Sequence, residues 1–265
     1  MERLDVREPF ASLWKGKDVF EEAFGIEGEV FRQVKNRTTL RFEHDGRAYF
    51  IKRHGPTSFR ELLKNLLQFR KPVPGANLEY DAIRRLEELG IRTMTIRAFG
   101  MRGRAPLHLE SFLITDELED RISLEDFCMN WRTEPPSEKL RRKLILRLAE
   151  TCGKMHAGGV NHQDCYLCHF LLDRGACGED DRLTLTVLDL HRAQIHETVP
   201  RRKQIKDLAG IVFSSMDLGL RKRDYLRFMA VYRRFCDIGP CVRASVWRAA
   251  CRLYRKEFGK PSPYA

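Results

Sequence analysis

The chain lacks a long apolar segment. Its 265 residues contain no run of ~18 consecutive apolar residues, the length that spans a membrane. Met1–Asp5 also lacks the apolar stretch of a secretory signal. These absences predict a protein that stays in the cytoplasm and whose contact with a membrane, if it makes one, is peripheral.

Acidic residues are the minority among the charged ones. Lys and Arg number 48 against 37 Asp and Glu, which gives a net charge of +11. A basic surplus of this size favours a polyanionic partner such as nucleic acid, a nucleotide, a phospholipid surface or an acidic protein. The charge alone does not choose among these partners.

A second cysteine pair at zinc-binding spacing is also missing. Cys165–His169 reads C-x-x-C-H, the pattern of covalent haem attachment, but that attachment follows export and no export signal is present. A zinc site would need further ligands at suitable spacing. We therefore expect Cys165 and Cys168 to be free thiols that pack in a loop or line it.

The first half of the chain is rich in strand patterns. Leu40–Glu43 and Arg47–Lys52 flank an Asp-Gly pair, which predicts a β-hairpin. A strand near Glu29–Arg32 is expected to pair with this hairpin. A helix is predicted over Asn77–Leu89, where apolar residues recur at helical spacing before a glycine. Further strands are predicted at Thr95–Arg97 and Ser111–Thr115.

Helix patterns dominate the second half. The predicted elements are a long helix from Pro135 to His156, a strand-rich stretch over Leu183–Leu190, and helix from Lys206 nearly to the end. A strand-rich lobe followed by a helical lobe makes the predicted fold class α+β. We predict two lobes, residues 1–118 and 119–265.

Candidate site residues follow one another in an order that suits phosphoryl transfer. They are Lys52 on the hairpin, Glu79 on the helix, the strand end at Asp116–Leu118, Asp164 in His162-Gln163-Asp164, and Asp189 after an apolar strand. Such a site needs cations and positioning. Lys52 would bind phosphate oxygens, and Glu79 would hold it by an ion pair. Asp164 would accept the proton of the attacking hydroxyl, and Asp189 would offer the carboxylate oxygen that metal ions such as Mg²⁺ prefer.

Two of these residues have a simpler interpretation that stays open. Lys52 can be the solvent-facing residue of an alternating strand, and Glu79 can belong to an exposed helix face together with Asp81. Asp164 has a stronger functional case because it lies in a polar loop between two apolar elements. Asp189 also has a stronger functional case because it lies at the end of a strand, where a carboxylate more often belongs to a functional site than to the packed core.

These motifs resemble those of a known family. Asn161–Leu172 looks like the catalytic loop of the bacterial lipopolysaccharide core heptose(I) kinases, and Val187–Gln194 is similar to their metal-binding segment. The resemblance extends over most of the chain, because further segments match as well: Thr39–Phe42, Tyr49–Lys52, Pro200–Arg202 and Lys206–Leu208. The resemblance implies a two-lobed protein-kinase-like fold. It also implies transfer of the γ-phosphate of ATP to the first heptose of the lipopolysaccharide inner core, at the cytoplasmic face of the inner membrane.

The resemblance also implies a role for each matching residue. Lys52 would be the phosphate-binding lysine and Asp164 the catalytic aspartate. Asp189 would ligate Mg²⁺, and Asp207 would be a structural carboxylate that braces the catalytic loop. The residues expected to contact ATP are then Lys52, Glu79, Asp116 and Leu118.

Two positions depart from the general kinase pattern. Kinases usually carry an asparagine as second metal ligand after the catalytic aspartate, and His169 stands there in this chain. Its imidazole suits softer ions than Mg²⁺, so His169 could ligate metal weakly or donate to a phosphate oxygen. The turn Val34–Thr38 has no glycine where a phosphate-covering loop is expected. Lys35 or Arg37 could supply charge there, although a solvated turn is the simpler interpretation.

Three basic regions remain, near Arg60–Arg70, Arg201–Lys203 and Arg221–Arg234. A solvated face is the usual explanation of such runs, but they would also suit lipid phosphates, an anionic inner-membrane surface or an acidic protein. Arg201 and Arg202, beyond Asp189, are the first choice for a substrate contact. The expected partners are ATP and the lipid A-core acceptor, and nucleic acid is not expected.

Two other functions stay open. A kinase-like enzyme could act on a protein or on another small-molecule hydroxyl such as an amino sugar, although a cationic acceptor would favour a less basic chain. A basic binding module without activity could keep a degenerate kinase fold. The missing glycines and His169 favour the module, and the joint presence of Lys52, Asp164 and Asp189 opposes it.

Overall fold

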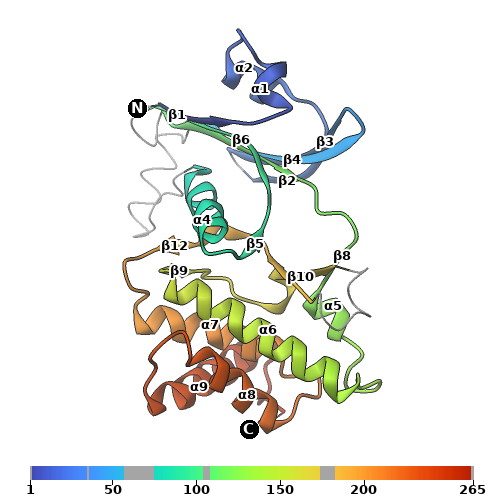
Figure 1. The fold of residues 1–265 in the computed structure, drawn as a ribbon, viewed down its shortest axis with the longest axis vertical. Coiled ribbons are helices and arrows are strands. Elements are labelled where there is room, and N and C mark those ends of the chain that lie inside the picture. The colour runs from blue at the N-terminus through green and yellow to red at the C-terminus, as the bar shows by residue number, and fades with distance from the viewer. Residues whose placement is uncertain (1, 35, 57–74, 104–107, 174–182, 264–265) are drawn as a thin grey trace. The chain divides into compact units, whose positions relative to one another are not determined.

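The chain folds into two compact units (Figure 1). The computed structural model describes residues 2–34, 36–56, 75–103, 108–173 and 183–263. One unit consists of Met1–Ile83 and Met94–Leu118, and the other of Arg84–Thr93 and Glu119–Ala265. The predicted division into lobes at residues 1–118 and 119–265 stays a prediction. Within the described residues, no helix is both long enough and apolar enough to cross a membrane.

An antiparallel sheet forms the first unit, with six strands among the described residues. In sheet order they are β1 (Glu2–Val6), β6 (Ile96–Arg102), β7 (Glu110–Asp116), β4 (Arg47–His54), β3 (Arg37–His44) and β2 (Glu29–Val34). The predicted hairpin is β3–β4, and Asp45 and Gly46 close it with φ angles of 49° and 71°. Two positive φ angles in a two-residue loop are the geometry that Asp-Gly favours. The hairpin is therefore confirmed, as is the pairing of β2 with β3.

Two short helices that we did not predict cover one face of this sheet, α1 (Phe10–Leu13) and α2 (Val19–Gly25). Asp18 begins α2, because its carboxylate accepts the N–H groups of Phe20 and Glu21 at 2.8 and 3.0 Å. Helices and strands enclose a largely aromatic core. Its main members are Phe10, Trp14, Phe20, Phe42, Tyr49 and Phe112.

The opposite face of the sheet carries Lys52. Successive side chains of a strand point to opposite faces. Tyr49 and Ile51 of β4 enter the aromatic core, so Lys52 projects from the other side. There it meets α4 (Asn77–Glu88), the helix that the apolar spacing predicted.

A small mixed sheet and several helices form the second unit. The sheet contains, in order, β5 (Arg92–Thr93), β11 (Leu185–Val187), β10 (Phe170–Asp173) and β8 (Arg121–Ser123), and β12 (Gln194–Ile195) pairs separately with β9 (Val160–Asn161). The helices in the described residues are α5 (Leu124–Cys128), α6 (Glu138–Ala157), α7 (Arg201–Ser214), α8 (Lys222–Tyr232), α9 (Pro240–Phe258) and the short turns η1 (Leu167–His169) and η3 (Leu190–Arg192). Helix α7 packs against α9, and α6 packs against α8.

The predicted long helix is confirmed as α6, and the predicted α+β class is confirmed with it. Ser137 begins α6 by accepting the N–H of Leu140 at 3.2 Å. Helix α7 differs from the prediction, because it begins at Arg201 rather than at Lys206. Pro200 stands at its N-cap, where the missing N–H removes no helical hydrogen bond. The basic region near residues 60–70 lies outside the described residues.

Candidate active site

Lys52 and Glu79 form an ion pair in the first unit. The Lys52 Nζ lies 2.6 Å from Glu79 Oε1. The Glu79 side chain is 2% exposed and that of Lys52 is 24% exposed. A carboxylate as buried as this one needs a cationic partner, so the pair holds the amine in one place while part of it stays accessible. The predicted pair is confirmed, and the interpretation of Glu79 as part of an exposed face is wrong.

Strand β4 gives Lys52 a rigid base. It is hydrogen-bonded on both sides, and Lys52 lies opposite Thr39 of β3 and Leu113 of β7. A strand within the sheet has less freedom to move than an edge strand or a loop. The amine is therefore fixed both through its backbone and through Glu79.

The carboxylate of Asp116, at the end of β7, is held by Arg97. Arg97 donates to the two carboxylate oxygens at 2.6 and 2.7 Å. Glu117, the next residue, is held in the same way by Arg41 at 2.8 Å. These carboxylates therefore have structural partners within the first unit. The backbone N–H of Asp116 also has a partner, because it donates to the carbonyl oxygen of Thr95 at 3.1 Å. A nucleotide contact at Asp116 would then fall to its carbonyl oxygen.

A single buried carboxylate organises the loop that contains Asp164. Asp207 of α7 is 1% exposed. Its Oδ2 accepts the N–H of His162 at 2.6 Å, and its Oδ1 accepts the N–H of Gln163 at 2.9 Å. Gln163 has a φ of 74°, a conformation that needs support from its surroundings. The bracing role that the resemblance implied for Asp207 is confirmed.

Close approach of the loop to α7 depends on Gly210. A Cβ atom at Gly210 would lie 2.3 Å from the carbonyl oxygen of Cys165. A side-chain carbon cannot come this close to a backbone oxygen without a steric clash, so position 210 has room for no side chain. Gly210 thus lets α7 come near enough for Asp207, on the preceding turn, to reach the loop backbone.

Asp164 itself is paired with a cation. One nitrogen of Arg192, Nη1, lies 2.9 Å from Oδ1 and 3.0 Å from Oδ2 of Asp164. The Arg192 side chain is 55% exposed and that of Asp164 is 19% exposed. The guanidinium group therefore lies on the solvent side of the carboxylate.

Asp189 lies in a strained conformation between two histidines. Its φ of 56° puts it in the left-handed region, which a non-glycine residue adopts at an energetic cost. His191 Nδ1 hydrogen-bonds to Oδ1 of Asp189, and His169 Nε2 lies 3.5 Å from Oδ2. The carboxylate is 34% exposed, so it can reach a ligand.

The arrangement of His169 and Asp189 fits a cation. His169 Nδ1 lies 2.7 Å from the carbonyl oxygen of Asp164. A carbonyl can only accept, so Nδ1 carries the proton and a neutral ring has its lone pair on Nε2. That lone pair faces the Asp189 carboxylate, and two acceptors at this distance need a proton or a metal ion between them. The donor set of one carboxylate and one imidazole can hold a divalent ion together with waters and phosphate oxygens.

The cysteines of the C-x-x-C-H pattern are free thiols, as expected. Burial raises the pKa of Cys165 well above its usual value. Burial also raises the pKa of the Cys168 thiol to about 11. Both stay protonated at neutral pH and are poor metal ligands. Among the described residues, no group of three or more His, Cys, Asp or Glu side chains could hold a metal ion.

Arg201 and Arg202 are the first two residues of α7, and both are exposed. They lie in the same unit as Asp164, and their role as substrate contacts stays a prediction. In the glycine-free turn, Asn36 exchanges hydrogen bonds with Gly55 at 2.7 and 2.8 Å. The turn is thus tied to the end of β4, and Lys35 lies outside the described residues.

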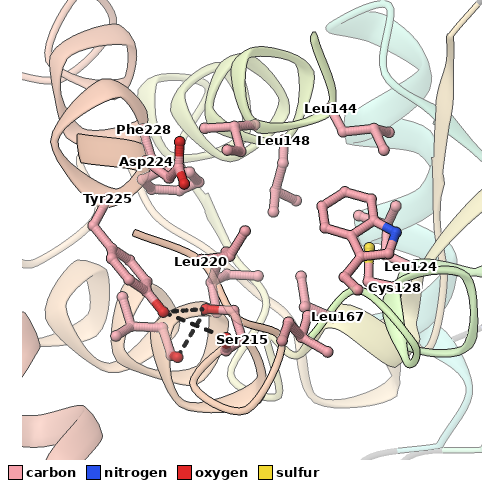
Figure 2. A pocket seen from close by; sticks show the side chains of 15 residues that line it. Leu124, Cys128, Leu144, Leu148, Leu167, Ser215, Leu220, Asp224, Tyr225 and Phe228 are labelled. Carbon is pink, nitrogen blue, oxygen red and sulfur yellow. Dashed lines mark hydrogen bonds between the residues drawn. The ribbon is translucent and has the colours of Figure 1, made fainter. Parts of the chain in front are cut away.

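An apolar pocket lies in the second unit, surrounded by α5, α6, α7 and α8 (Figure 2). Aliphatic side chains such as Leu148, Leu167 and Leu220 line it together with Phe228. Some polar groups in its wall have partners, among them the carboxylate of Asp224, which accepts the N–H of Arg221 at 2.9 Å. The hydroxyl of Ser215, for example, donates to the carbonyl oxygen of Val212 at 2.9 Å. An interior this apolar suits a hydrocarbon group better than a polar ligand.

Arg192 and His191 are the site residues that sequence reasoning did not assign. Both follow Asp189 within the segment Val187–Gln194, so they were part of the quoted motif. Their proximity to Asp189 in sequence was the available signal. The contact of Arg192 with Asp164 joins residues 28 positions apart and has no local sequence pattern.

Comparison with known proteins points to one family. The lipopolysaccharide kinase (Kdo/WaaP) family matches residues 21–232. The chain is 51% identical over 229 residues, 86% of each chain, to the lipopolysaccharide core heptose(I) kinase WaaP of Escherichia coli. It is 47% identical over 232 residues to WaaP of Pseudomonas aeruginosa, covering 88% of this chain and 87% of that one. A solved structure of WaaP in complex with acyl carrier protein is 41% identical, with a TM-score of 0.82 over 97% of this chain and 99% of that one.

Proposed function

The chain belongs to the lipopolysaccharide kinase (Kdo/WaaP) family, and from this premise we propose that it transfers the γ-phosphate of ATP to the first heptose of the lipopolysaccharide inner core. The enzyme is a phosphotransferase with a sugar hydroxyl as acceptor. Its 51% identity to a curated lipopolysaccharide core heptose(I) kinase over 86% of both chains is the observation that carries the choice of acceptor.

The two groups of site residues support roles in this reaction. Lys52 would bind α- and β-phosphate oxygens, with its amine positioned by Glu79. Asp164 would orient the heptose hydroxyl and receive its proton. Asp189 would hold the Mg²⁺ ion, with His169 Nε2 as the neighbouring donor. When bound, the metal neutralises charge on the phosphate oxygens.

The strand end after β7 is the proposed contact for the adenine base. Because Arg97 holds the Asp116 carboxylate and the Asp116 N–H donates to Thr95, we assign this contact to the carbonyl oxygen of Asp116 and the backbone groups of Leu118. Backbone donors and acceptors suit the edge of a base, which presents both kinds of group. Asp116→Asn should therefore lower the affinity for an ATP analogue only modestly, as measured by calorimetry, if the base binds to the backbone. A loss of 100-fold or more would contradict it.

Loss of the Lys52–Glu79 pair should weaken nucleotide binding. We expect Lys52→Met to lower the affinity for a Mg²⁺–ATP analogue by about tenfold or more, because a charge-assisted contact to phosphate is lost. Glu79→Gln should lower it less, and the double variant should resemble Lys52→Met alone, because the two residues act as one unit. Isothermal titration calorimetry measures all three affinities.

A matched control lies on the same helix. Asp81 pairs with Arg3 at 2.7 Å, and both side chains are at least one-third exposed. Asp81→Asn removes an ion pair of α4 without touching Lys52, so nucleotide affinity should stay within about twofold of the wild type. If Asp81→Asn and Glu79→Gln lower the nucleotide affinity equally, a specific role for Glu79 is contradicted.

Charge and family together support a place at the cytoplasmic face of the inner membrane. The net charge of +11 favours peripheral contact with anionic lipids, and Arg201 and Arg202 are the proposed contacts for acceptor phosphates. Sedimentation with anionic vesicles should retain the protein at low salt and release it at high salt. Equal retention on neutral vesicles would contradict this proposal.

An acyl carrier protein is the proposed acidic partner. A relative with the same fold over nearly its whole length forms such a complex, and this chain offers a basic surplus and the apolar pocket of Figure 2. We propose that the pocket receives the acyl chain. Native mass spectrometry should detect a one-to-one complex with acylated carrier protein. The complex should weaken in Leu220→Glu, which places a charge in the pocket wall.

Acceptor choice tests the proposed function directly. Purified protein, labelled ATP and Mg²⁺ should label a heptosylated lipid A-core acceptor and leave proteins and amino sugars unlabelled. Labelling of a protein or an amino sugar without labelling of heptose would favour the other kinase function. Absence of Mg²⁺–ATP binding in calorimetry would favour the non-catalytic module.

A further inference from the structure

Arg192 occupies both oxygens of the proposed proton acceptor. Its Nη1 contacts Asp164 Oδ1 and Oδ2 at 2.9 and 3.0 Å. A hydroxyl that is to pass its proton to Asp164 must approach the same two oxygens. The guanidinium group and the acceptor hydroxyl therefore compete for one carboxylate.

The geometry makes Arg192 the more movable partner. Its side chain is 55% exposed, whereas Asp164 is 19% exposed in a loop that is fixed by Asp207. The remaining guanidinium nitrogens, Nε and Nη2, make no hydrogen bond to a described residue. Arg192 can thus present a two-pronged donor to a carboxylate or phosphate group.

The surroundings of Arg192 favour a further anion. Although much of Lys206 is exposed, desolvation of its amine and the positive charge of Arg192 lower its pKa. Lys203, which lies on α7 with Lys206, is a third cation and also lowers this pKa, whereas the carboxylates of Asp164 and Asp207 raise it. Within the part of the chain that the structure describes, the amines of Lys206 and Lys203 donate to the neutral side chains of Gln163 and Gln194, at 3.1 and 3.0 Å, and to no carboxylate. An anion bound here would relieve the mutual repulsion of these cations.

We propose that Arg192 selects the acceptor: it leaves Asp164 for an anionic group beside the reacting hydroxyl, and so frees Asp164 only when an anionic acceptor is bound. This inference rests on the proposed function. Asp164 then takes the hydroxyl proton, the hydroxyl oxygen forms a bond to the γ-phosphorus, and the bond from that phosphorus to the β–γ bridging oxygen breaks. Its electron pair leaves with ADP.

The anionic group can be a carboxylate of a neighbouring sugar acid or a phosphate of the lipid portion. Three acceptors separate these sources: a heptose linked to a sugar acid, the methyl ester of the same compound, and a phosphorylated core fragment with an esterified sugar acid. For wild-type protein, kcat/KM should be about tenfold to 100-fold higher with an anionic compound than with the neutral ester, provided that Arg192 recognises that anionic group.

Arg192→Ala should remove that preference. We expect its kcat/KM for the anionic acceptor to fall by about tenfold or more, mainly through KM, while the value for the neutral ester stays unchanged or rises. ATP hydrolysis without an acceptor should rise, because Asp164 is no longer covered. Arg192→Lys should restore part of the preference. Arg248 is exposed, and its one hydrogen bond within the described residues goes to Ser245 at 3.4 Å. Arg248→Ala is therefore the matched control and should behave as wild type.

Several outcomes would overturn the inference. Equal use of all three compounds by wild-type protein does so without any variant, even if Arg192→Ala fails to fold. The inference is also overturned if Arg192→Ala keeps the wild-type preference for the anionic acceptor. It is overturned as well if kcat/KM falls equally for the anionic acceptor and the neutral ester. A wild-type protein that labels no heptose compound at all overturns the proposed function instead.

Discussion

Replacement of Asp164 by alanine should lower kcat for heptose phosphorylation by about 10²–10⁴-fold, the usual contribution of a positioned proton acceptor. The change removes the carboxylate that would orient the hydroxyl and receive its proton. Binding of a Mg²⁺–ATP analogue should stay within about twofold, because Lys52 and Asp189 remain. Transfer of labelled phosphate to the lipid acceptor and calorimetry with the analogue measure the two effects separately.

Asp237 provides the control for Asp164. It is an exposed aspartate of the same unit that is placed in no site, and Asp237→Ala should keep wild-type turnover. Asp164→Ala should also keep the thermal unfolding temperature of the wild type within a few degrees, since the lost carboxylate forms an ion pair with the exposed Arg192 and with no other residue that the structure describes. Full turnover in Asp164→Ala would exclude Asp164 as the proton acceptor.

Replacement of Asp207 by alanine should affect both stability and activity. It leaves the N–H groups of His162 and Gln163 without their acceptor in a buried place, and each unpaired group costs about 1–3 kcal/mol. We expect the free energy of unfolding to fall by about 3 kcal/mol. We also expect kcat to fall by at least about tenfold well below the unfolding transition, because the loop that holds Asp164 loses its brace. Denaturant titration and turnover at low temperature measure the two quantities.

Asp207→Asn refines this test, because an amide oxygen can accept one of the two N–H groups and its NH₂ group cannot accept the other. Its stability should lie between those of the wild type and Asp207→Ala. Asp217 is the matched control, since it accepts a bond from Tyr254 at 3.0 Å but is itself exposed. Asp217→Asn should lower stability by no more than about 1 kcal/mol. Equal stability of Asp207→Ala and the wild type would contradict the bracing role.

The parts of the site that depend on local patterns could be predicted from the sequence. The Asp-Gly turn fixed the register of β3 and β4, and that register put Lys52 opposite Thr39. The apolar spacing of the following helix then left Glu79 as a carboxylate that could reach Lys52. Both steps depend on short-range periodicity, which a single sequence contains.

Contacts between segments remote in the chain could not be predicted in this way. The pairing of Arg192 with Asp164 follows from how the turn after β11 meets the loop after β9, and no periodicity encodes it. Helices α1 and α2 are too short to show a repeating apolar pattern, so the aromatic core they complete was missed. The start of α7 was misplaced because a proline beside three basic residues also suits a loop.

The two-sided character of β4 has an evolutionary consequence. Tyr49 and Ile51 are 1% and 0% exposed in the aromatic core, while Lys52 serves the other face. Insertion or deletion of one residue between Tyr49 and Lys52 would exchange the faces and drive a charged amine among aromatic rings. Evolution of this protein can therefore replace one core side chain by another of similar size. The number of residues in this strand has to stay constant. Length variation should collect in the loops instead.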